Sequence, residues 1–407
     1  MRTPDHAQVK LNRTISLPML IFYGVGVTIG AGIFALIGEL VGLAGHQAPL
    51  AFLLAGIIAG VTGVSYAKLS SIYPRAGGEA VYVNIGMGPF WGRVVGLGVT
   101  ATAIISSAVV ALAFAGYFQQ LLHLPTPLIT SIVILTLAGI AWFGVRESVL
   151  FAAAITLLEI GALIVIGSLG AANLMDMNAV VQSLNPLAEN ADLIAITSAA
   201  MIAFFAFIGF EDIVNMAEET KDPEKNVPRA ILVTLVLTII VYMLVALVAV
   251  TSIEQHTLAA SRAPLADLYT AVSGRDGALI ALIAAIAMVN GILVQVVMAS
   301  RMLYGMAQEK LVPGFFGVLD PKRQTPLYAT WFVAGLTILL ALSFPLVHLA
   351  QATSAIILFV FSLVNFSLWR LGGRTETPTL LRKWRWWGLS GTVICAGLLL
   401  GEAIKLI

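Results

Sequence analysis

Long apolar runs separated by short polar joints constrain this chain more than any other feature. A helix needs roughly 20 apolar residues to cross a bilayer. The chain carries eleven runs of about that length or longer, with 59% hydrophobic and only 11% charged residues. Soluble domains carry about 25% charged residues. The predicted fold class is therefore an all-α polytopic membrane protein. The eleven predicted transmembrane spans are 16–42, 48–72, 90–122, 127–144, 149–171, 193–217, 228–251, 277–305, 327–346, 348–369 and 386–404.

The distribution of Lys and Arg predicts the orientation. With the N-terminus in the cytoplasm, nineteen of the 22 basic residues fall on the cytoplasmic side, and only Arg262, Arg275 and Lys405 fall outside. Cytoplasmic loops of membrane proteins carry this excess. We therefore expect a multi-pass protein of the cytoplasmic membrane with its N-terminus inside and its C-terminus outside.

Two of the spans are interrupted near their midpoints. The first contains GVGVTIGAGIF (Gly24 to Phe34), and the sixth contains FFAFIGFED (Phe204 to Asp212). Irregular backbone in a membrane survives only inside protein or beside a water-filled cavity. Each interrupted span comes first in a group of five, and the two run in opposite directions. Such paired breaks indicate an inverted-repeat transporter with a site at the midplane.

The backbone at two such breaks can bind a zwitterion. Amides at a helix start attract a carboxylate, and free carbonyls at a helix end attract an ammonium group. We predict carboxylate contacts from the amides of Gly30, Ala31 and Gly32, and ammonium contacts from carbonyls near Val27 and Phe205. The predicted substrate is an amino acid. Close helix packing through small residues is the alternative explanation for the glycines.

Further motifs carry a family resemblance. They are YPRAGGEAVYV (73–83), EETKDPEKNVPRAI (218–231) and ASRMLYGMAQEKLVPGFF (299–316) followed by Thr325–Pro326. Together with the two breaks, this chain resembles the amino acid–polyamine–organocation transporters, near the bacterial cationic amino acid transporter branch.

The resemblance implies a LeuT-type five-plus-five inverted repeat with broken helices 1 and 6, and transport by alternating access. The predicted parts are a cytoplasmic tail (1–15), a first repeat (16–171), a second repeat (193–370) and an additional helix (386–407). Relatives commonly have twelve spans, so the chain departs from them in its last part.

The family's binding pattern maps onto the same residues. It implies that Gly30, Ala31 and Gly32 hold the carboxylate, while carbonyls of Val27, Phe205, Ala206 and Ile208 hold the amine. It also makes Phe207 or Phe210 a candidate aromatic gate, with ordinary core or lipid contact as the alternative. The loop after span 3 has no cysteine. A disulfide-linked glycoprotein subunit of the kind found on mammalian relatives is therefore not expected.

Glu159 is a carboxylate near the middle of span 5. Ionisable groups at that depth are costly, so the default reading is functional. Many relatives carry a lysine at this position. Three roles are open for Glu159: proton carrier, direct cation ligand, or counter-ion that favours cationic substrates. A structural hydrogen bond between helices is the alternative.

Glu211 and Asp212 begin the inner half of span 6. Acids at a helix N-terminus are stabilising by about 0.3–1 kcal/mol each, so capping competes with a coupling role.

The leading predicted function is secondary active transport of amino acids, by proton-coupled symport or by exchange. One alternative is transport of amines or polyamines with Glu159 as counter-ion. Another is a membrane sensor that binds without transporting. No enzyme, metal site, cofactor or nucleic-acid partner is expected, because the sequence shows no His–carboxylate cluster and no metal-ligand spacing.

Overall fold

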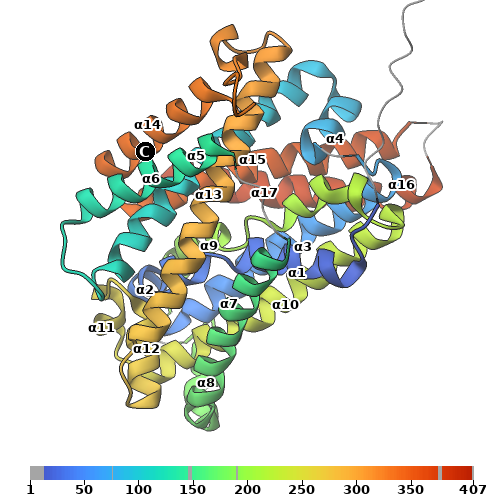
Figure 1. Ribbon diagram of the computed structural model, residues 1–407. Coiled ribbons are helices and arrows are strands. Elements are labelled where there is room, and N and C mark those ends of the chain that lie inside the picture. Colours follow the sequence, from blue (N-terminus) through green and yellow to red (C-terminus); the bar gives the residue numbers. More distant parts are fainter. Residues whose placement is uncertain (1–12, 76, 145–148, 189–190, 375–377, 406–407) are drawn as a thin grey trace, which may run out of the picture.

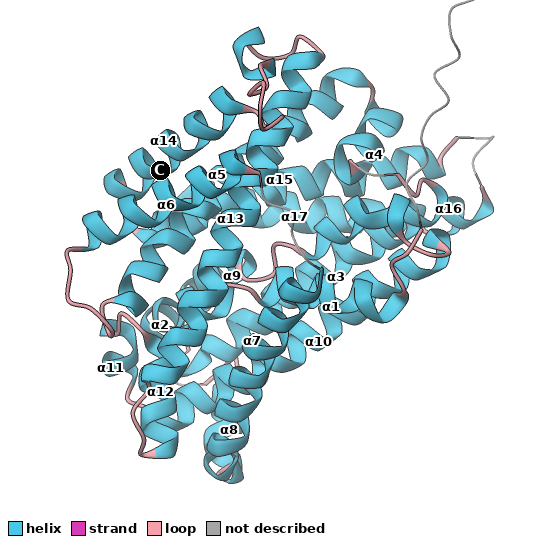
Figure 2. Cartoon of the chain, in the orientation of Figure 1, coloured by secondary structure: helices cyan, strands magenta, loops and turns pink. Residues whose placement is uncertain are grey.

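The computed structural model describes residues 13–75, 77–144, 149–188, 191–374 and 378–405, and the side chains of 149–152 lie outside the description. Within these ranges the chain is helical and has no strand, apart from two isolated bridges, Ile15 with Thr220 and Leu319 with Pro326 (Figure 2). The helices form one bundle. Its two ends are named here by the short helices that lie there: α4 (Gly78–Met87) and α16 (Thr379–Lys383) at the α4 end, and α8 (Met177–Ser183), α11 (Gln255–Ala260) and α12 (Pro264–Ser273) at the α8 end (Figure 1).

The long helices follow the apolar runs. They are α3 (Ala48–Ile72), α5 (Pro89–Phe118), α6 (Thr126–Phe143), α7 (Val149–Leu169), α10 (Pro223–Ser252), α13 (Ala278–Gln308), α14 (Leu327–Ser343), α15 (Leu346–Gly372) and α17 (Arg385–Lys405). The first span is divided into α1 (Leu17–Ile29) and α2 (Gly32–Ala44), and the sixth into α9 (Leu193–Phe205) and the 3-10 segment η3 (Phe210–Glu219).

Length and composition support the membrane assignment. In the described part of the chain, nine helical segments are long and apolar enough to cross a bilayer, and two further apolar helices, α1 and α14, are shorter. The chain is thus a multi-pass membrane protein. Several helices have proline in the first turn, for example Pro49 in α3 and Pro223 in α10. Proline is tolerated there because its missing N–H would have no intrahelical partner.

The divided helices lie at the centre of the bundle. α1 packs against α10 and α7, α2 against α9, and α10 along α3. α5 packs along α13 and α15. The side chains around the two breaks are almost fully buried, including Ile29, Ile33, Phe204 and Phe207. Any site at the breaks therefore lies inside protein, as irregular backbone at membrane depth requires.

The motif RAGGEAVYV leads into α4, a helix that is packed into the bundle. α4 packs against α5, α15 and η3, and its Glu79, Tyr82 and Val83 are buried. Gly77 and Gly88 flank the helix with positive φ angles of 89° and 103°. Only glycine adopts such angles without strain. The second glycine of RAGGEAVYV, Gly78, also has a positive φ of 31°. The sequence motif thus forms a helix docked against the divided span 6.

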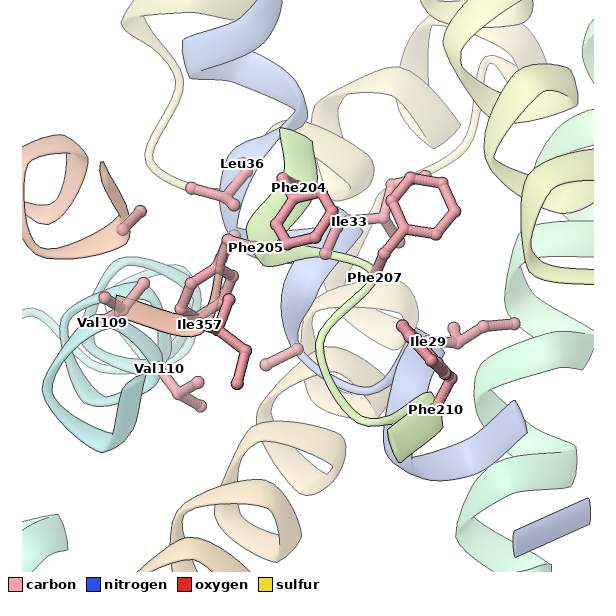
Figure 3. Close-up of a cluster of buried hydrophobic side chains, with 14 of the residues drawn as sticks. Ile29, Ile33, Leu36, Val109, Val110, Phe204, Phe205, Phe207, Phe210 and Ile357 are labelled. Carbon is pink, nitrogen blue, oxygen red and sulfur yellow. The ribbon is translucent and has the colours of Figure 1, made fainter. Parts of the chain in front are cut away.

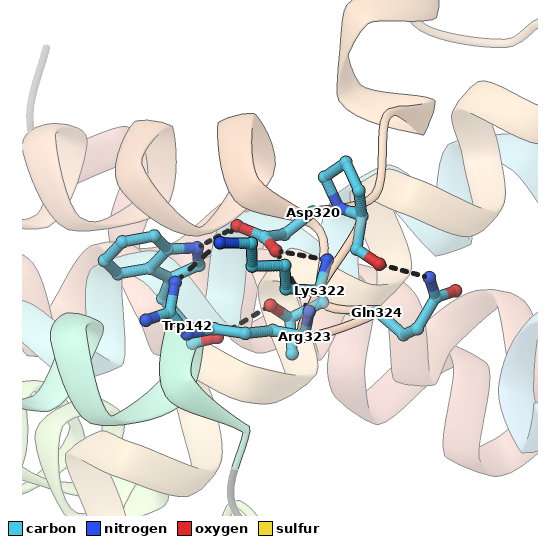
Figure 4. Close-up of polar contacts among 7 residues, drawn as sticks. Trp142, Asp320, Lys322, Arg323 and Gln324 are labelled. Atoms are coloured by element: carbon cyan, nitrogen blue, oxygen red, sulfur yellow. Dashed lines mark hydrogen bonds and ion pairs between the residues drawn. The ribbon is translucent and has the colours of Figure 1, made fainter.

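Polar contacts hold the loop before α14 against the end of α6 (Figure 4). Asp320 accepts hydrogen bonds from the indole of Trp142 (3.2 Å) and from the amides of Lys322 and Arg323 (2.9 Å each). The Arg323 guanidinium lies over the rings of Trp142 and Phe143 at 4.0 and 4.1 Å. The bond from the Arg323 amide holds the pKa of Asp320 below its ordinary value. These contacts join the end of α6 to the loop before α14, which is far away in the sequence.

α17 docks on α15 and α3 through small residues and one polar cluster. The Asn365 amide donates to the hydroxyl of Thr62 (3.0 Å) and lies 3.9 Å from the thiol of Cys395. A Cβ added at Gly391 would lie 2.6 Å from the Asn365 side-chain oxygen, whereas one added at Gly397 meets nothing within 4 Å.

We therefore expect Gly391→Ala to destabilise the docking of α17 by about 1–3 kcal/mol through overpacking. The melting temperature of the purified protein in detergent should fall by several degrees. Gly397→Ala, on the same helix, is the matched control and should melt like wild type. Equal melting temperatures for both variants would contradict this packing.

Candidate functional site

The break in the first span is set by Gly30. α1 ends at Ile29 and α2 begins at Gly32. Gly30 has φ +22° and ψ −132°, and its amide donates to the carbonyl of Gly26 (3.1 Å). The helix therefore ends in a turn that a residue with a side chain would resist. The break lies where the glycine pattern predicts it.

The break in the sixth span is a series of tight turns. After α9 ends at Phe205, the amides of Ala206, Phe207 and Ile208 each donate to the carbonyl three residues earlier, at 3.0, 3.0 and 3.1 Å. Gly209 then takes φ +124° before η3 begins. The positive angle again explains a glycine at the predicted position.

The two breaks touch each other. A Cβ added at Gly32 would lie 2.6 Å from the Cα of Ala206, and one added at Gly209 would lie 2.9 Å from the carbonyl oxygen of Val27. Glycine at both positions allows this backbone contact. The alternative reading of the glycines, close helix packing, thus also holds, because the packing occurs at the breaks themselves.

Tyr242 of α10 ties both breaks together. Its hydroxyl lies 3.0 Å from the carbonyl oxygen of Thr28, 3.2 Å from that of Ile29 and 2.8 Å from that of Ala206. One hydroxyl proton serves only one of these acceptors at a time. Three carbonyls from two helix ends therefore converge on a single donor, as they would on an ammonium group.

The amides predicted for the carboxylate are only partly free. The amide of Gly30 donates to the carbonyl of Gly26 and is not an open donor in the structure. The amides of Ala31 and Gly32 donate to no carbonyl across the break within the described residues. On the carbonyl side, Phe205 accepts from Ile208 and Ala206 accepts from Tyr242. The ligand roles of all these residues stay predictions.

Phenylalanines surround the breaks (Figure 3). Phe207 packs edge-on against Tyr242 with ring centroids 5.2 Å apart, and Phe210 packs against Phe361 at 5.4 Å. Both side chains are fully buried. Phe205 points toward Ile357, Val109 and Val110 (Figure 3). The gate candidates Phe207 and Phe210 therefore have core contacts, and only Phe207 touches the bridging tyrosine.

Glu159 lies close to this centre. Its side chain is buried, its Oε2 has no hydrogen-bond partner, and its carboxylate lies within electrostatic reach of the Tyr242 hydroxyl. Thr156, one turn earlier on α7, lies directly against Gly26. α7 thus places a carboxylate beside the tyrosine that bridges the breaks. The Oε2 atom makes no hydrogen bond to another helix, and the role of Glu159 stays a prediction.

Glu211 and Asp212 have different surroundings. Glu211 accepts from the amide of Gly209 (2.8 Å), so it stabilises the start of η3 as a capping acid does. Asp212 accepts from the side-chain amide of Asn215 (3.4 Å) and lines a cavity at the α4 end. Glu211 and Asp212 therefore have different hydrogen-bond partners, although their carboxylates still interact electrostatically.

Comparisons with known proteins agree with this architecture. The sequence model described as "Amino acid permease" matches residues 15–401. The chain belongs to the amino acid permease family. This confirms the resemblance to the amino acid–polyamine–organocation transporters.

Three relatives show the range of names in the family. The permease is 26% identical to a branched-chain amino acid permease of Bacillus subtilis, over 92% of this chain and 84% of the relative. It is 29% identical to cationic amino acid transporter 5 of Arabidopsis thaliana, over 91% of this chain and 67% of the relative. It is 28% identical to a methylthioribose transporter of Bacillus subtilis, over 79% and 73%.

Two residues of the permease were not predicted from the sequence. Tyr242 stands in an apolar run, TIIVYMLVALV, where Thr238 is the other residue with a hydroxyl. Buried tyrosines usually find a hydrogen-bond partner, and that rule could have marked it. Glu79 stands between small and apolar residues in AGGEAVYV. Its carboxylate is buried in the structure, which the local sequence does not indicate.

Removing the bridging hydroxyl tests the geometry of the permease centre. Tyr242→Phe leaves the ring contacts with Phe52 and Phe207 in place. It removes the hydroxyl that lies within hydrogen-bond distance of the carbonyls of Thr28, Ile29 and Ala206. An unmade buried hydrogen bond costs about 1–3 kcal/mol, so substrate affinity or exchange rate should change roughly 5- to 100-fold. Counterflow in liposomes measures the rate, and wild-type kinetics would contradict the bridge.

Proposed function

We propose that this permease moves amino acids across the cytoplasmic membrane by alternating access, as a proton-coupled symporter or as an exchanger. The observation that carries the proposal is the contact of two helix breaks at the centre of the bundle. Backbone amides of one half-helix and carbonyls of others meet there, surrounded by protein. A site with both kinds of group is complementary to a zwitterion.

The proposed topology has eleven passes with the N-terminus in the cytoplasm. α1 with α2, α3, α5, α6 and α7 form the first repeat, and α9 with η3, α10, α13, α14 and α15 form the second. α17 is additional. Support comes from the basic residues, from the two breaks at corresponding positions, and from the helix order. The α4 end is then cytoplasmic.

The proposed binding mode follows from the free groups. The substrate carboxylate binds the amides of Ala31 and Gly32, and the Gly30 amide joins them if its bond to Gly26 opens. The ammonium binds the carbonyls of Val27 and Ala206, with those of Phe205 and Ile208 nearby. Because the breaks touch, substrate entry must part Gly32 from Ala206 and shift the Tyr242 hydroxyl.

The surroundings favour a substrate with an apolar side chain. Phe205, Val109, Val110 and Ile357 gather on one side of the breaks (Figure 3). Burying an apolar side chain there is favourable by about 25 cal/mol per Å². Two of the relatives carry the name branched-chain amino acid permease. Phe207 is the proposed aromatic gate, since it touches Tyr242.

One observation favours a second candidate. The buried Oε2 of Glu159 has no hydrogen-bond partner, so a cationic amine would find a counter-ion there. An amine or polyamine transporter is therefore the alternative, and a non-transporting sensor is the third possibility.

A set of matched ligands separates these functions. The purified protein is screened by thermal shift with the natural amino acids and polyamines, and the best ligand is compared with its methyl ester and its decarboxylated amine. Reconstituted protein is then tested for counterflow of the radiolabelled ligand. We expect binding of the amino acid alone, followed by counterflow. Retained binding of the ester and amine would indicate the amine transporter, and binding without counterflow would indicate a sensor.

A further inference from the structure

A cavity of about 470 Å³ lies at the α4 end of the bundle. Its lining includes Tyr23 of α1, Glu79 of α4, Asp212 and Asn215 of η3, and Arg301 of α13. The cavity therefore joins the half-helices of both divided spans to the short helix α4. The substrate-binding geometry derived above does not use Glu79 or this cavity.

Two carboxylates from different elements face this cavity. Glu79 is 4% exposed and Asp212 is 7% exposed. The Oε2 of Glu79 has no hydrogen-bond partner among the described residues, and the two carboxylates are close enough to interact electrostatically. Two like charges that share a buried site do not both ionise readily. An added proton would remove the repulsion.

The groups around the pair offer no compensating buried cation. Tyr66 of α3 and Tyr82 of α4 have buried hydroxyls without a partner, and Tyr66 lies within electrostatic reach of Glu79, Glu211 and Asp212. Arg301 is an exposed residue of the cavity lining. Arg374 binds the carbonyls of Ile85 and Gly86 at the far end of α4. No ion pair to Glu79 or Asp212 is formed in the described part of the chain.

α4 and η3 are linked directly beside the pair. The Gly77 amide donates to the side-chain oxygen of Asn215 (3.1 Å), and the Asn215 amide donates to Asp212 (3.4 Å). Gly78 packs so closely on Val214 that a Cβ there would overlap it. Repulsion between Glu79 and Asp212 therefore acts across a contact between two elements that could separate.

We propose that Glu79 and Asp212 together bind one proton, and that this proton holds α4 against η3 and so keeps the α4 end of the permease closed. The inference rests on the proposed transport function for its role in coupling. Glu79, which lies outside the spans, is the proton-binding residue, and Asp212 is its partner. Binding converts one carboxylate to a carboxylic acid, and opening to water releases the same proton on that side.

The pH dependence follows from burial. Burial, opposed by a bond from its own backbone amide and assisted by the carboxylate of Asp212, raises the pKa of Glu79 to about 8. On exposure to water the pKa returns toward its ordinary value near 4.5. The closed contact binds the proton more tightly than the open one, so its stability falls as pH rises from about 4.5 to about 8.

Cysteine labelling tests the contact without any substrate. Cys395 is the single cysteine and is buried, so Cys395→Ala gives a cysteine-free background. Met298→Cys places a thiol in the cavity lining, and Lys322→Cys is an exposed reference. We expect the ratio of their labelling rates with a neutral thiosulfonate to rise at least roughly tenfold between pH 5 and pH 9. The ratio corrects for thiolate formation in the reagent reaction.

Three variants identify the responsible groups. Glu79→Gln should flatten the labelling ratio, because it removes the titrating group. Asp212→Asn should reduce the pH dependence, because it removes the repulsion that adds to the effect of burial on Glu79. Glu218→Gln is the matched control, since it removes an exposed carboxylate from the same segment η3. A wild-type profile in Glu79→Gln, or no pH dependence in the wild type, would overturn the proposal.

A transport measurement tests the coupling role. In liposomes, Glu79→Gln should lose at least roughly tenfold in substrate accumulation driven by a pH gradient, while counterflow at equal pH continues. Undiminished accumulation would overturn the coupling role. Failure of the proposed function is distinguishable, because then the wild type itself shows no counterflow while the labelling result still stands.

Discussion

Gly30→Val is expected to abolish substrate binding while the protein still inserts and folds. The reason is local. Gly30 holds φ +22°, which a β-branched residue strongly resists. A Cβ at this position would also lie 3.2 Å from the carbonyl oxygen of Val27, one of the proposed ammonium ligands. The substitution should therefore both distort the break and crowd the binding backbone. We expect at least a 100-fold loss of affinity, equal to about 2.7 kcal/mol.

The control is the same substitution where space is open. A Cβ at Gly60 of α3 meets nothing within 4 Å, so Gly60→Val should insert and bind like wild type. Insertion is measured by membrane expression and by a monodisperse profile in detergent, and binding by thermal shift with the best ligand. Gly30→Val with wild-type affinity would show that the substrate does not bind at the break.

The positions of the breaks could be predicted because their cause is local. A glycine with positive φ is needed at Gly30 and at Gly209, and both stand in runs where a glycine is otherwise costly. The apolar runs likewise predict where the long helices lie, because length and hydropathy decide that. The loop helices α8, α11 and α12 were not predicted, since short segments carry too little periodicity.

The contacts across the breaks could not be predicted. Tyr242 is 36 residues from Ala206 and more than 200 from Thr28, and only the packing of α10 brings its hydroxyl to both. The engaged amide of Gly30 depends on the turn that this chain adopts. The burial of Glu79 depends on α4 docking against η3. The Tyr242 bridge and the burial of Glu79 come from tertiary contacts, which local sequence does not encode, whereas the Gly30 bond is a local feature of the helix end.

Glu159 and the pair at the α4 end occupy different places along the proposed path. Glu159 lies near Tyr242 at the breaks, whereas Glu79 and Asp212 face the cavity at the α4 end. A change at Glu159 should therefore leave the pH dependence of labelling at Met298→Cys unchanged, because Glu159 does not line that cavity. A change at Glu79 should affect the opening of one end. The two sites are separable by experiment.

Glu159→Gln is expected to abolish accumulation driven by a pH gradient while exchange without a gradient persists. Glutamine keeps the size and most of the hydrogen bonding of glutamate but cannot carry a proton. The carboxylate is buried and its Oε2 has no partner, so it has an open position for a proton. We expect at least a tenfold loss of accumulation in liposomes, equal to about 1.4 kcal/mol in driving force.

The same variant decides among the three roles of Glu159. If it is a counter-ion, affinity should fall for cationic ligands and stay unchanged for neutral ones, and thermal shift with matched ligands measures this. If it ligates a cation directly, transport should depend on that cation in the wild type and lose the dependence in the variant. Wild-type accumulation, affinity and pH profile in Glu159→Gln would make the residue structural. The coupling group would then be sought at Asp212 and Glu79, because Glu211 is already engaged by the amide of Gly209.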